Sequence, residues 1–307
     1  MRAITYSEFG SADVLELTEQ PDPHIGPDTL LVRVKAASVN PVDWKVRQGY
    51  LEGLIDTELP AIPGWDVAGV VEQVGLDTTE LEVGDEVYGY VRKDTVRGGT
   101  FAELVAAPVR TLARKPASLS FEEAAAVPLA GLTAYQAIQR AGVKDGQTVL
   151  VHAAAGGVGA FGVQLAKALG ARVIGTASEG NHEFLRGLGA EPVTYGDGLA
   201  DRVRAIAPDG IDVALDFAGG DAVATSAELL ADGGTIASIA DAAARTEHGG
   251  HYVWVRPSTA DLDALTALFD AGKLSVEIAQ TFDLADAAEA HRANETGHTR
   301  GKVVVRI

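Results

Sequence analysis

Short runs of β-branched and aromatic residues, broken by polar turns, fill the first third of the chain and predict strands. The expected strands cover residues 3–6, 14–19, 30–39, 67–74, 86–90 and 101–106, and glycine, proline and aspartate stand between them. Such a set is typical of a partly closed β-barrel. Two helices follow, because Ser120 and Glu123 form a capping-box pattern and residues 133–141 have helical spacing.

From residue 147 the pattern changes to apolar strands that alternate with helices. Strands are expected at 148–152, 172–176, 192–195, 212–216, 234–239 and 252–255, and helices at about 159–169, 180–188, 198–206 and 221–230. This order predicts a doubly wound parallel sheet. A helix at 259–271, a strand near 277–282, a helix at 284–294 and a last strand at 302–307 complete the chain, and we expect them to fold back on the first domain.

The turn after the first of these parallel strands is rich in glycine. It has the form Ala154-x-Gly156-x-x-Gly159, which is the dinucleotide fingerprint G-x-G-x-x-G with alanine at the first position. A helix that begins directly after such a turn points free backbone N–H groups and its positive dipole end at a bound pyrophosphate. A turn without a ligand is the alternative, but the strands and the helix around it fit the fingerprint. We expect Ala154, Gly156, Gly157, Val158 and Gly159 to contact a dinucleotide.

The end of the second parallel strand indicates which nicotinamide dinucleotide is bound. Ser178, nineteen residues after Gly159, stands where NAD enzymes of this fold carry an acid for the ribose 2′-hydroxyl. A serine does not repel a 2′-phosphate, so NADPH is predicted. Glu179 only interacts favourably with the helix dipole if its side chain points outward, and it opposes NADPH if the side chain points inward. His182 and Tyr195 are nearby candidate donors, and a solvated helix residue is the alternative for His182.

Small or apolar residues follow the fourth and fifth parallel strands, where loops meet ligands in such sheets. We expect Phe217, Ala218, Ile239 and Ala240 to contact the nicotinamide ring. The histidines at 152, 248, 251, 291 and 298 show no metal-ligand spacing and are interpreted as ordinary polar residues.

Composition excludes several classes of protein. The 307 residues carry a net charge of −18, which argues against a nucleic-acid partner, and no apolar run is long enough to span a membrane. Cysteine is absent, so thiol nucleophiles and thiolate metal ligands are excluded. The first residues alternate like a strand and do not resemble a secretory signal, so a cytoplasmic protein is expected.

Six or more ordered sequence blocks resemble one family, and the resemblance covers nearly the whole chain. They are AASVNPVD at 36–43, PGWDVAGVV at 63–71, VGDEV at 83–87, GTFAE at 99–103, AGLTAY at 130–135, the glycine turn, DVALD at 212–216 and GKVVV at 301–305. The chain resembles the medium-chain dehydrogenases/reductases of the zeta-crystallin-like quinone oxidoreductase group. This resemblance implies a GroES-like, partly open β-barrel catalytic domain of residues 1–118 and 257–307, and a Rossmann dinucleotide-binding domain of residues 119–256.

The wider superfamily includes zinc alcohol dehydrogenases, and the resemblance places their catalytic zinc ligands at Asn40, Trp65 and about Leu129. These residue types do not form a zinc site, which needs cysteine, histidine or carboxylate ligands. The four-cysteine structural lobe is also missing. We therefore expect no metal, and we expect Trp65 to fill the core beneath the cleft.

The resemblance also implies that Asn40 and Asp43 line the cleft beside the nicotinamide and that Thr133 touches the cofactor. For Asn40 and Asp43 the alternative is a turn around Pro41, since asparagine and aspartate commonly shape turns.

Lys45 and Tyr50 are, with Asp43, the candidate catalytic residues. Lys45 is able to donate to a substrate carbonyl or to pair with Asp43, and a solvated lysine is the alternative. Tyr50 is the nearest phenol for proton supply.

Together these observations predict a zinc-independent reductase that transfers a hydride from NADPH to a small quinone or a conjugated enone. A 2-alkenal or enoyl double-bond reductase on the same scaffold and a non-catalytic NADPH-binding redox sensor are the alternatives. The apolar segment 251–255 is expected at the edge of the sheet, where an uncovered strand invites pairing. We therefore predict a homodimer through this strand.

Overall fold

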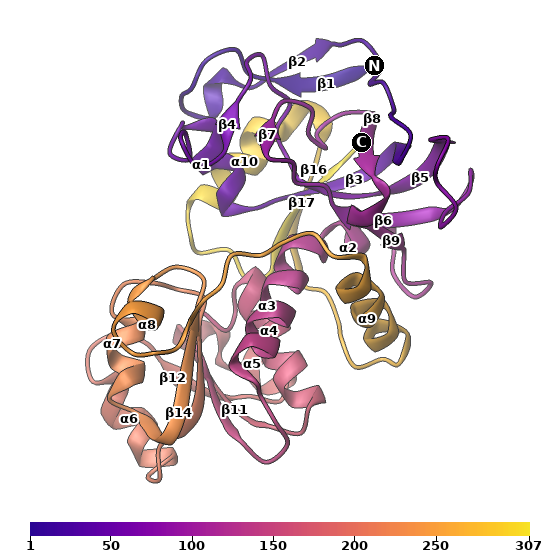
Figure 1. Ribbon diagram of the computed structural model, residues 1–307. Helices are drawn as coiled ribbons and strands as arrows, with labels where there is room; N and C mark the ends of the chain where they lie inside the picture. The colour runs from indigo at the N-terminus through magenta and orange to yellow at the C-terminus, as the bar shows by residue number, and fades with distance from the viewer. The chain divides into compact units, whose positions relative to one another are not determined.

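The computed structural model describes residues 1–307, and the chain divides into two compact units. Unit 1 consists of Met1–Leu129 and Pro257–Ile307, and unit 2 consists of Ala130–Arg256. Residues 257–307 therefore return to the first unit, as predicted, and both chain ends lie in unit 1 (Figure 1). No helix combines the length and the apolar character needed to cross a bilayer.

Unit 1 is built around a seven-stranded, mostly antiparallel sheet in the order β16-β17-β3-β5-β6-β9, with β8 paired to β3. The strands of unit 1 as a whole are β1 (Arg2–Thr5), β2 (Glu16–Glu19), β3 (Thr29–Val39), β4 (Asp56–Thr57), β5 (Asp66–Val74), β6 (Glu86–Tyr90), β7 (Thr95–Val96), β8 (Leu104–Pro108), β9 (Leu112–Arg114), β16 (Ile278–Asp283) and β17 (Lys302–Arg306). Its helices are α1 (Pro41–Arg47), α2 (Phe121–Ala125), α9 (Thr259–Asp270) and α10 (Ala287–Glu295).

Unit 2 is a six-stranded sheet in the order β12-β11-β10-β13-β14-β15, in which every pair is parallel. Its strands are β10 (Thr148–Val151), β11 (Arg172–Ala177), β12 (Glu191–Thr194), β13 (Ile211–Asp216), β14 (Leu230–Ser238) and β15 (His251–Tyr252). Its helices are α4 (Gly157–Ala168), α5 (His182–Gly187), α6 (Leu199–Ile206), α7 (Ala222–Ala227) and α8 (Ala243–Thr246), and α3 (Pro128–Ala141) enters it from unit 1.

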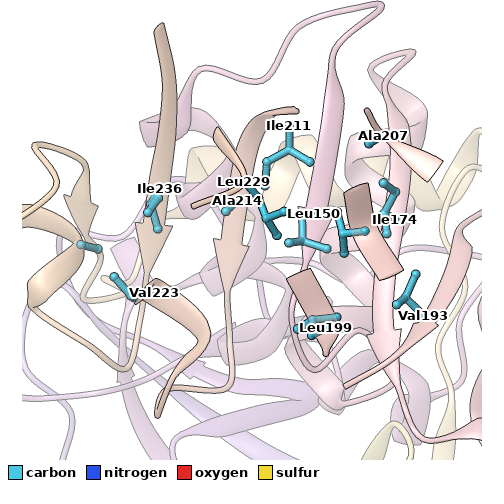
Figure 2. Packing of buried hydrophobic residues seen from close by; sticks show 12 residues of the cluster. Leu150, Ile174, Val193, Leu199, Ala207, Ile211, Ala214, Val223, Leu229 and Ile236 are labelled. Atoms are coloured by element: carbon cyan, nitrogen blue, oxygen red, sulfur yellow. The ribbon is translucent and has the colours of Figure 1, made fainter. Parts of the chain in front are cut away.

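The strands of unit 2 are apolar because helices cover the sheet. Leu150, Ile174, Ala214 and Ile236, one from each of four neighbouring strands, form a buried cluster with apolar residues of α6 and α7 (Figure 2). Burial of each leucine or isoleucine side chain stabilises the fold by about 1.5–3 kcal/mol. The cluster holds the strands in place, and their carboxyl ends carry the loops that the sequence analysis singled out.

Two differences from the predicted elements concern the junction between the barrel and the parallel sheet. We expected the domain boundary after residue 118, but α2 packs against β3 and β5 and therefore belongs to unit 1. The predicted capping box is present, because Ser120 and Glu123 each accept the other's backbone N–H. Helix α3 begins at Pro128, five residues before the predicted start, since proline is well suited to a first helical turn.

Candidate functional site

The glycine turn of unit 2 leaves the first amides of α4 without a capping side chain. Gly156 is the N-cap residue and has no side-chain oxygen, so Gly157, Val158 and Gly159 present their N–H groups as an open anion site. Ala153 holds a positive φ of 50°, which bends the chain sharply between β10 and α4. The turn therefore has the local geometry that a dinucleotide pyrophosphate requires.

Close packing explains why the third position of the fingerprint is glycine. A Cβ at Gly159 would lie 2.1 Å from the carbonyl oxygen of Ala153, and one at Gly175 would lie 2.9 Å from the Cβ of Ala154. The helix, the turn and β11 thus touch through backbone and small side chains. Alanine at position 154 is accommodated because the facing residue on β11 is Gly175.

His152, directly before the turn, is a correction to the sequence analysis. We interpreted it as an ordinary polar residue, but it is buried, and its Nε2 lies 2.8 Å from Oγ of Ser226. Burial lowers the pKa of its imidazole to about 4, although the nearby Asp216 opposes the shift. His152 is therefore neutral near pH 7 and joins β10 to α7.

Ser178, His182 and Tyr195 come together at one edge of unit 2. Ala177 of β11 pairs with Thr194 of β12, so Ser178 and Tyr195 continue from neighbouring strands. The His182 ring lies 3.4 Å from Oγ1 of Thr194. Ser178 and Tyr195 are exposed, so a group bound at this edge would meet polar side chains.

Arg202 holds the loop that carries Tyr195 in place. Its guanidinium donates to the carbonyl oxygens of Thr194, Gly196 and Asp197 at 2.8–3.2 Å. All three guanidinium nitrogens of Arg202 therefore donate to backbone carbonyl oxygens of the protein itself. This function of Arg202 was not predicted, because an arginine four residues after Gly198 gave only a weak sequence signal for it.

The loops after β13 and β14 are tied together by one aspartate. Asp216 accepts hydrogen bonds from the N–H groups of Ala218 and Gly219, both at 2.8 Å, and from the hydroxyl of Ser238 at 2.6 Å. Ser238 in turn accepts from the N–H of Ala240 at 3.1 Å. Ala218 and Ala240, which were predicted to contact the nicotinamide ring, are therefore held in place by these hydrogen bonds.

The two predicted apolar contacts in these loops lie in the same region. A Cβ added at Gly162 of α4 would lie 2.7 Å from the Phe217 ring, so this ring packs directly against α4. The N–H of Ile239 bonds to the carbonyl of Asp216 at 3.1 Å. Thr133 is buried within α3.

In unit 1, Asn40 belongs to a buried polar cluster centred on Asp66. Asp66 accepts hydrogen bonds from Asn40 Nδ2, Ser38 Oγ and the N–H of Leu129, each at 2.8 Å. The Lys302 ammonium donates to Oδ1 of Asn40 and lies 3.8 Å from Asp66. Both ends of the Asn40 amide are therefore bonded within the protein, a role that the sequence analysis did not foresee.

This cluster places two carboxyl groups and one ammonium out of contact with water. Burial raises the pKa of Asp66 and lowers that of Lys302, and the attraction between the two opposes both shifts. Asp43 is also buried. Burial raises the pKa of its carboxyl to about 7, the neighbouring Asp66 adds to this shift, and the bond from the Asn40 N–H opposes it.

Asn40 and Asp43 lie at the start of helix α1. The alternative considered for them from the sequence was a turn around Pro41. Asn40 is the N-cap residue, and its N–H donates to Oδ2 of Asp43 at 2.7 Å. Pro41 stands at the first helical position, where its missing N–H is not needed. The pattern N-P-x-D is thus a helix start.

Lys45 and Tyr50, the other catalytic candidates, lie at the surface. The exposed Lys45 ammonium is 5.5 Å from the centre of the Trp44 ring and does not pair with the buried Asp43. Tyr50 is 69% exposed and meets the same tryptophan edge-on. Trp65 is buried and packs edge-on against Tyr90, as expected of a core residue.

His291 is a second histidine that the sequence analysis interpreted as ordinary but that the structure buries. Its Nδ1 lies 3.1 Å from the guanidinium of Arg47, which is itself fully buried and pairs with Glu295 at 2.8 Å. Burial lowers the pKa of His291 to about 3. This cluster joins α1 to α10 and is structural.

Comparison with known proteins places this arrangement in a family. Residues 26–117 match the alcohol dehydrogenase GroES-like domain, and residues 188–305 match the zinc-binding dehydrogenase model. A 2-methylene-furan-3-one reductase of Solanum lycopersicum and a chloroplastic NADPH-dependent alkenal/one oxidoreductase of Arabidopsis thaliana are each 36% identical over 99% of this chain and 79% of their own length. The chain belongs to the medium-chain dehydrogenase/reductase superfamily. It is therefore an oxidoreductase with a nicotinamide cofactor.

A solved structure supports the quinone oxidoreductase-like branch of this superfamily. The quinone oxidoreductase from Coxiella burnetii has a TM-score of 0.90 and 37% identity, covering 100% of this chain and 99% of its own. The predicted GroES-like and Rossmann architecture is confirmed.

One of the matching family models is named for zinc, and the side chains of this reductase do not fit that metal. The three positions that resemble zinc-ligand positions carry an amide, an indole and an alkyl group. The amide oxygen of Asn40 accepts from the Lys302 ammonium, and Asp66 binds both Asn40 and the Leu129 backbone. Asp66 and Lys302 were missed as functional residues, although a charged residue at the start of an apolar strand was visible in both sequence blocks.

Proposed function

We propose that this protein transfers a hydride from NADPH to conjugated enones and quinones without a metal ion. The observation that carries the proposal is that the three positions that resemble the superfamily's zinc-ligand positions carry Asn40, Trp65 and Leu129, and that the Asn40 amide is bonded to Asp66 and Lys302. Without a Lewis acid, an oxidoreductase is suited to acceptors that are already electron-poor. The names of the alkenal/one, furanone and quinone reductases among its relatives support this substrate class.

The residues of unit 2 fit a nicotinamide dinucleotide. The amides of Gly157, Val158 and Gly159 would hold the pyrophosphate, and the loops fixed by Asp216 would contact the ring. Bound there, the cofactor supplies a hydride. Ser178 would donate to a 2′-phosphate, so we propose NADPH over NADH; the relative from Arabidopsis thaliana that is named NADPH-dependent supports this choice.

Reduction of an enone also requires a proton at the α-carbon or the carbonyl oxygen. Tyr50, Lys45 and Asp43 remain the proposed sources. Asp43 is the buried one of the three, and because burial raises the pKa of its carboxyl to about 7, it holds a proton in part of the molecules near neutral pH.

The proposal is tested by following the loss of NADPH absorbance with p-benzoquinone, methyl vinyl ketone and trans-2-hexenal. We expect turnover with at least one of these acceptors and none with a saturated aldehyde or a simple alcohol plus NADP⁺. A faster rate with trans-2-hexenal than with the quinone would favour the alternative 2-alkenal reductase. NADPH binding without oxidation by any acceptor would contradict the proposal and favour the redox sensor.

A further inference from the structure

Unit 1 contains a cavity of about 560 Å³, within the size range of small-molecule sites, that no residue of the proposed reaction lines. We name it the β8 cavity. Most of its side chains are apolar: Pro21, Pro23, Leu59, Pro60, Ile62, Leu104, Val105 and Ala106. They come from the segment after β2, from residues 58–62 and from β8. Met1, Thr5, Gln20, Gly98 and Gly99 also line it.

The charged side chains of the cavity are Glu58, Arg97 and Lys93, and two of them balance each other. Arg97 pairs with Glu58 at 3.3 Å, and both side chains are largely exposed. No carboxylate or carbonyl oxygen accepts a hydrogen bond from the ammonium of Lys93, and burial lowers the pKa of this lysine. One cation thus stands without a partner in a cavity whose side chains are mostly apolar, in a chain whose net charge is −18.

The wall that carries Lys93 is fixed by backbone contacts. Strands β4 and β7 pair through Asp56–Thr95 and Thr57–Val96, and the N–H of Ile62 donates to the carbonyl of Arg97 at 2.7 Å. A Cβ at Gly99 would lie 2.3 Å from the carbonyl oxygen of Pro63, so the two segments touch directly. The cavity is therefore preformed, which lowers the entropic cost of binding.

We propose that the β8 cavity binds a small molecule with an apolar body and one carboxylate, and that Lys93 pairs with the carboxylate. A single unpaired cation in apolar surroundings matches a monoanion, whereas a phosphate needs several donors. Lys93 also lines a small recess with Trp65 and Val91, so a ligand in the cavity would fix a segment that packs beside Trp65. This site is separate from the proposed reaction and stands on the geometry of unit 1 alone.

The probe pair for the test is sodium octanoate and octanamide, which have the same apolar chain and differ in charge. Isothermal titration of the full-length protein at pH 7 is expected to show octanoate binding about tenfold tighter than octanamide, which corresponds to about 1.4 kcal/mol. Lys93→Met should remove this preference and Lys93→Arg should keep it. Lys35→Met, the same substitution at an exposed lysine of β3 outside the cavity, should leave it unchanged.

Several results would overturn the proposal: no octanoate binding at millimolar concentration, equal affinity for the two probes, or equal effects of Lys93→Met and Lys35→Met. Loss of octanoate binding in the presence of saturating NADPH would place the probe in the cofactor site and would also overturn it. Thermal unfolding of each variant checks that it is folded. An inactive reductase with intact octanoate binding would contradict the proposed reaction and leave the cavity proposal supported.

Discussion

The ammonium of Lys302 donates a hydrogen bond to Oδ1 of Asn40, joining the last strand of the chain to the start of α1. The same ammonium lies 3.8 Å from Asp66 and 3.3 Å from the carbonyl oxygen of Val39. A buried cation thus holds together the residues at two of the positions that resemble zinc-ligand positions, Asn40 and, through Asp66, Leu129. The cluster fixes the geometry of this region through hydrogen bonds.

Lys302→Met is expected to destabilise unit 1 by about 3 kcal/mol, because removing one partner leaves the Asp66 carboxylate buried without its counter-charge. The double variant with Asp66→Asn should recover part of this loss. Chemical denaturation followed by tryptophan fluorescence measures both. Lys35→Met is the control for loss of an exposed lysine. Equal stability of the Lys302 variant and this control would show that the buried pair contributes nothing.

The pKa of Asp43 predicts a pH dependence of stability. Its carboxyl has a pKa of about 7 in the folded chain against ~3.9 when unfolded, so the folded state binds more protons between these values. Stability due to this group is present below about pH 4 and is lost as the pH rises to 7. The charges of Asp66 and Lys302 also act on the Asp43 carboxyl. A test of this pH dependence therefore changes Asp43 and leaves Asp66 and Lys302 in place.

Asp43→Asn is expected to become more stable relative to the native protein as the pH rises from 4 to 7, by up to roughly 4 kcal/mol. The asparagine side chain keeps an oxygen able to accept the Asn40 N–H, so the helix start is retained. Thermal unfolding midpoints across this range give the difference. A constant difference at all pH values would mean that Asp43 titrates as in the unfolded chain.

The sequence predicted the parallel sheet well because its signals are local. The central strands β10, β11 and β13 are mostly apolar runs, and the glycine fingerprint depends on adjacent residues. Short elements such as β4, β7 and α8 were missed because two to four residues carry no periodicity.

The candidate site of unit 1 was harder to predict because its contacts join distant parts of the chain. Lys302 and Asn40 are 262 residues apart, and Asp66 and Leu129 are 63 apart. The burial of His152 and His291 likewise depends on packing by other elements. Residue type and spacing therefore indicated which residues belong near the site, and tertiary contacts decide what each of them does.

Gly159→Ala is expected to abolish NADPH binding and to destabilise unit 2 by about 3 kcal/mol, because the new Cβ would meet the Ala153 carbonyl at 2.1 Å. Gly180→Ala is the matched control, since nothing lies within 4 Å of a Cβ at that position. Cofactor titration by fluorescence and thermal unfolding measure the two effects. Retained NADPH binding in the Gly159 variant would contradict the assignment of this turn.

Ser178→Asp tests the proposed preference for NADPH. A carboxylate at the end of β11 would repel a 2′-phosphate and accept from a ribose hydroxyl, so kcat/KM with NADPH should fall about tenfold or more while that with NADH is kept or raised. Glu179→Gln distinguishes the two orientations of that side chain, since NADPH use improves only if Glu179 faces the cofactor. A native enzyme that prefers NADH would refute the proposal.

The edge of the parallel sheet supports the proposed homodimer. Strand β15 pairs only with β14, and it covers His251–Tyr252, so the predicted edge strand 251–255 is shorter than expected. Tyr252 in this strand is 36% exposed and Trp254, two residues after it, is 42% exposed, so both leave apolar surface at the edge. Light scattering after gel filtration should give the mass of two chains. Trp254→Lys should shift the mass toward one chain, because a charge on this edge opposes pairing. Leu76→Lys, a change at a fully exposed leucine of unit 1, should have no effect. A native mass of one chain would refute pairing through this strand.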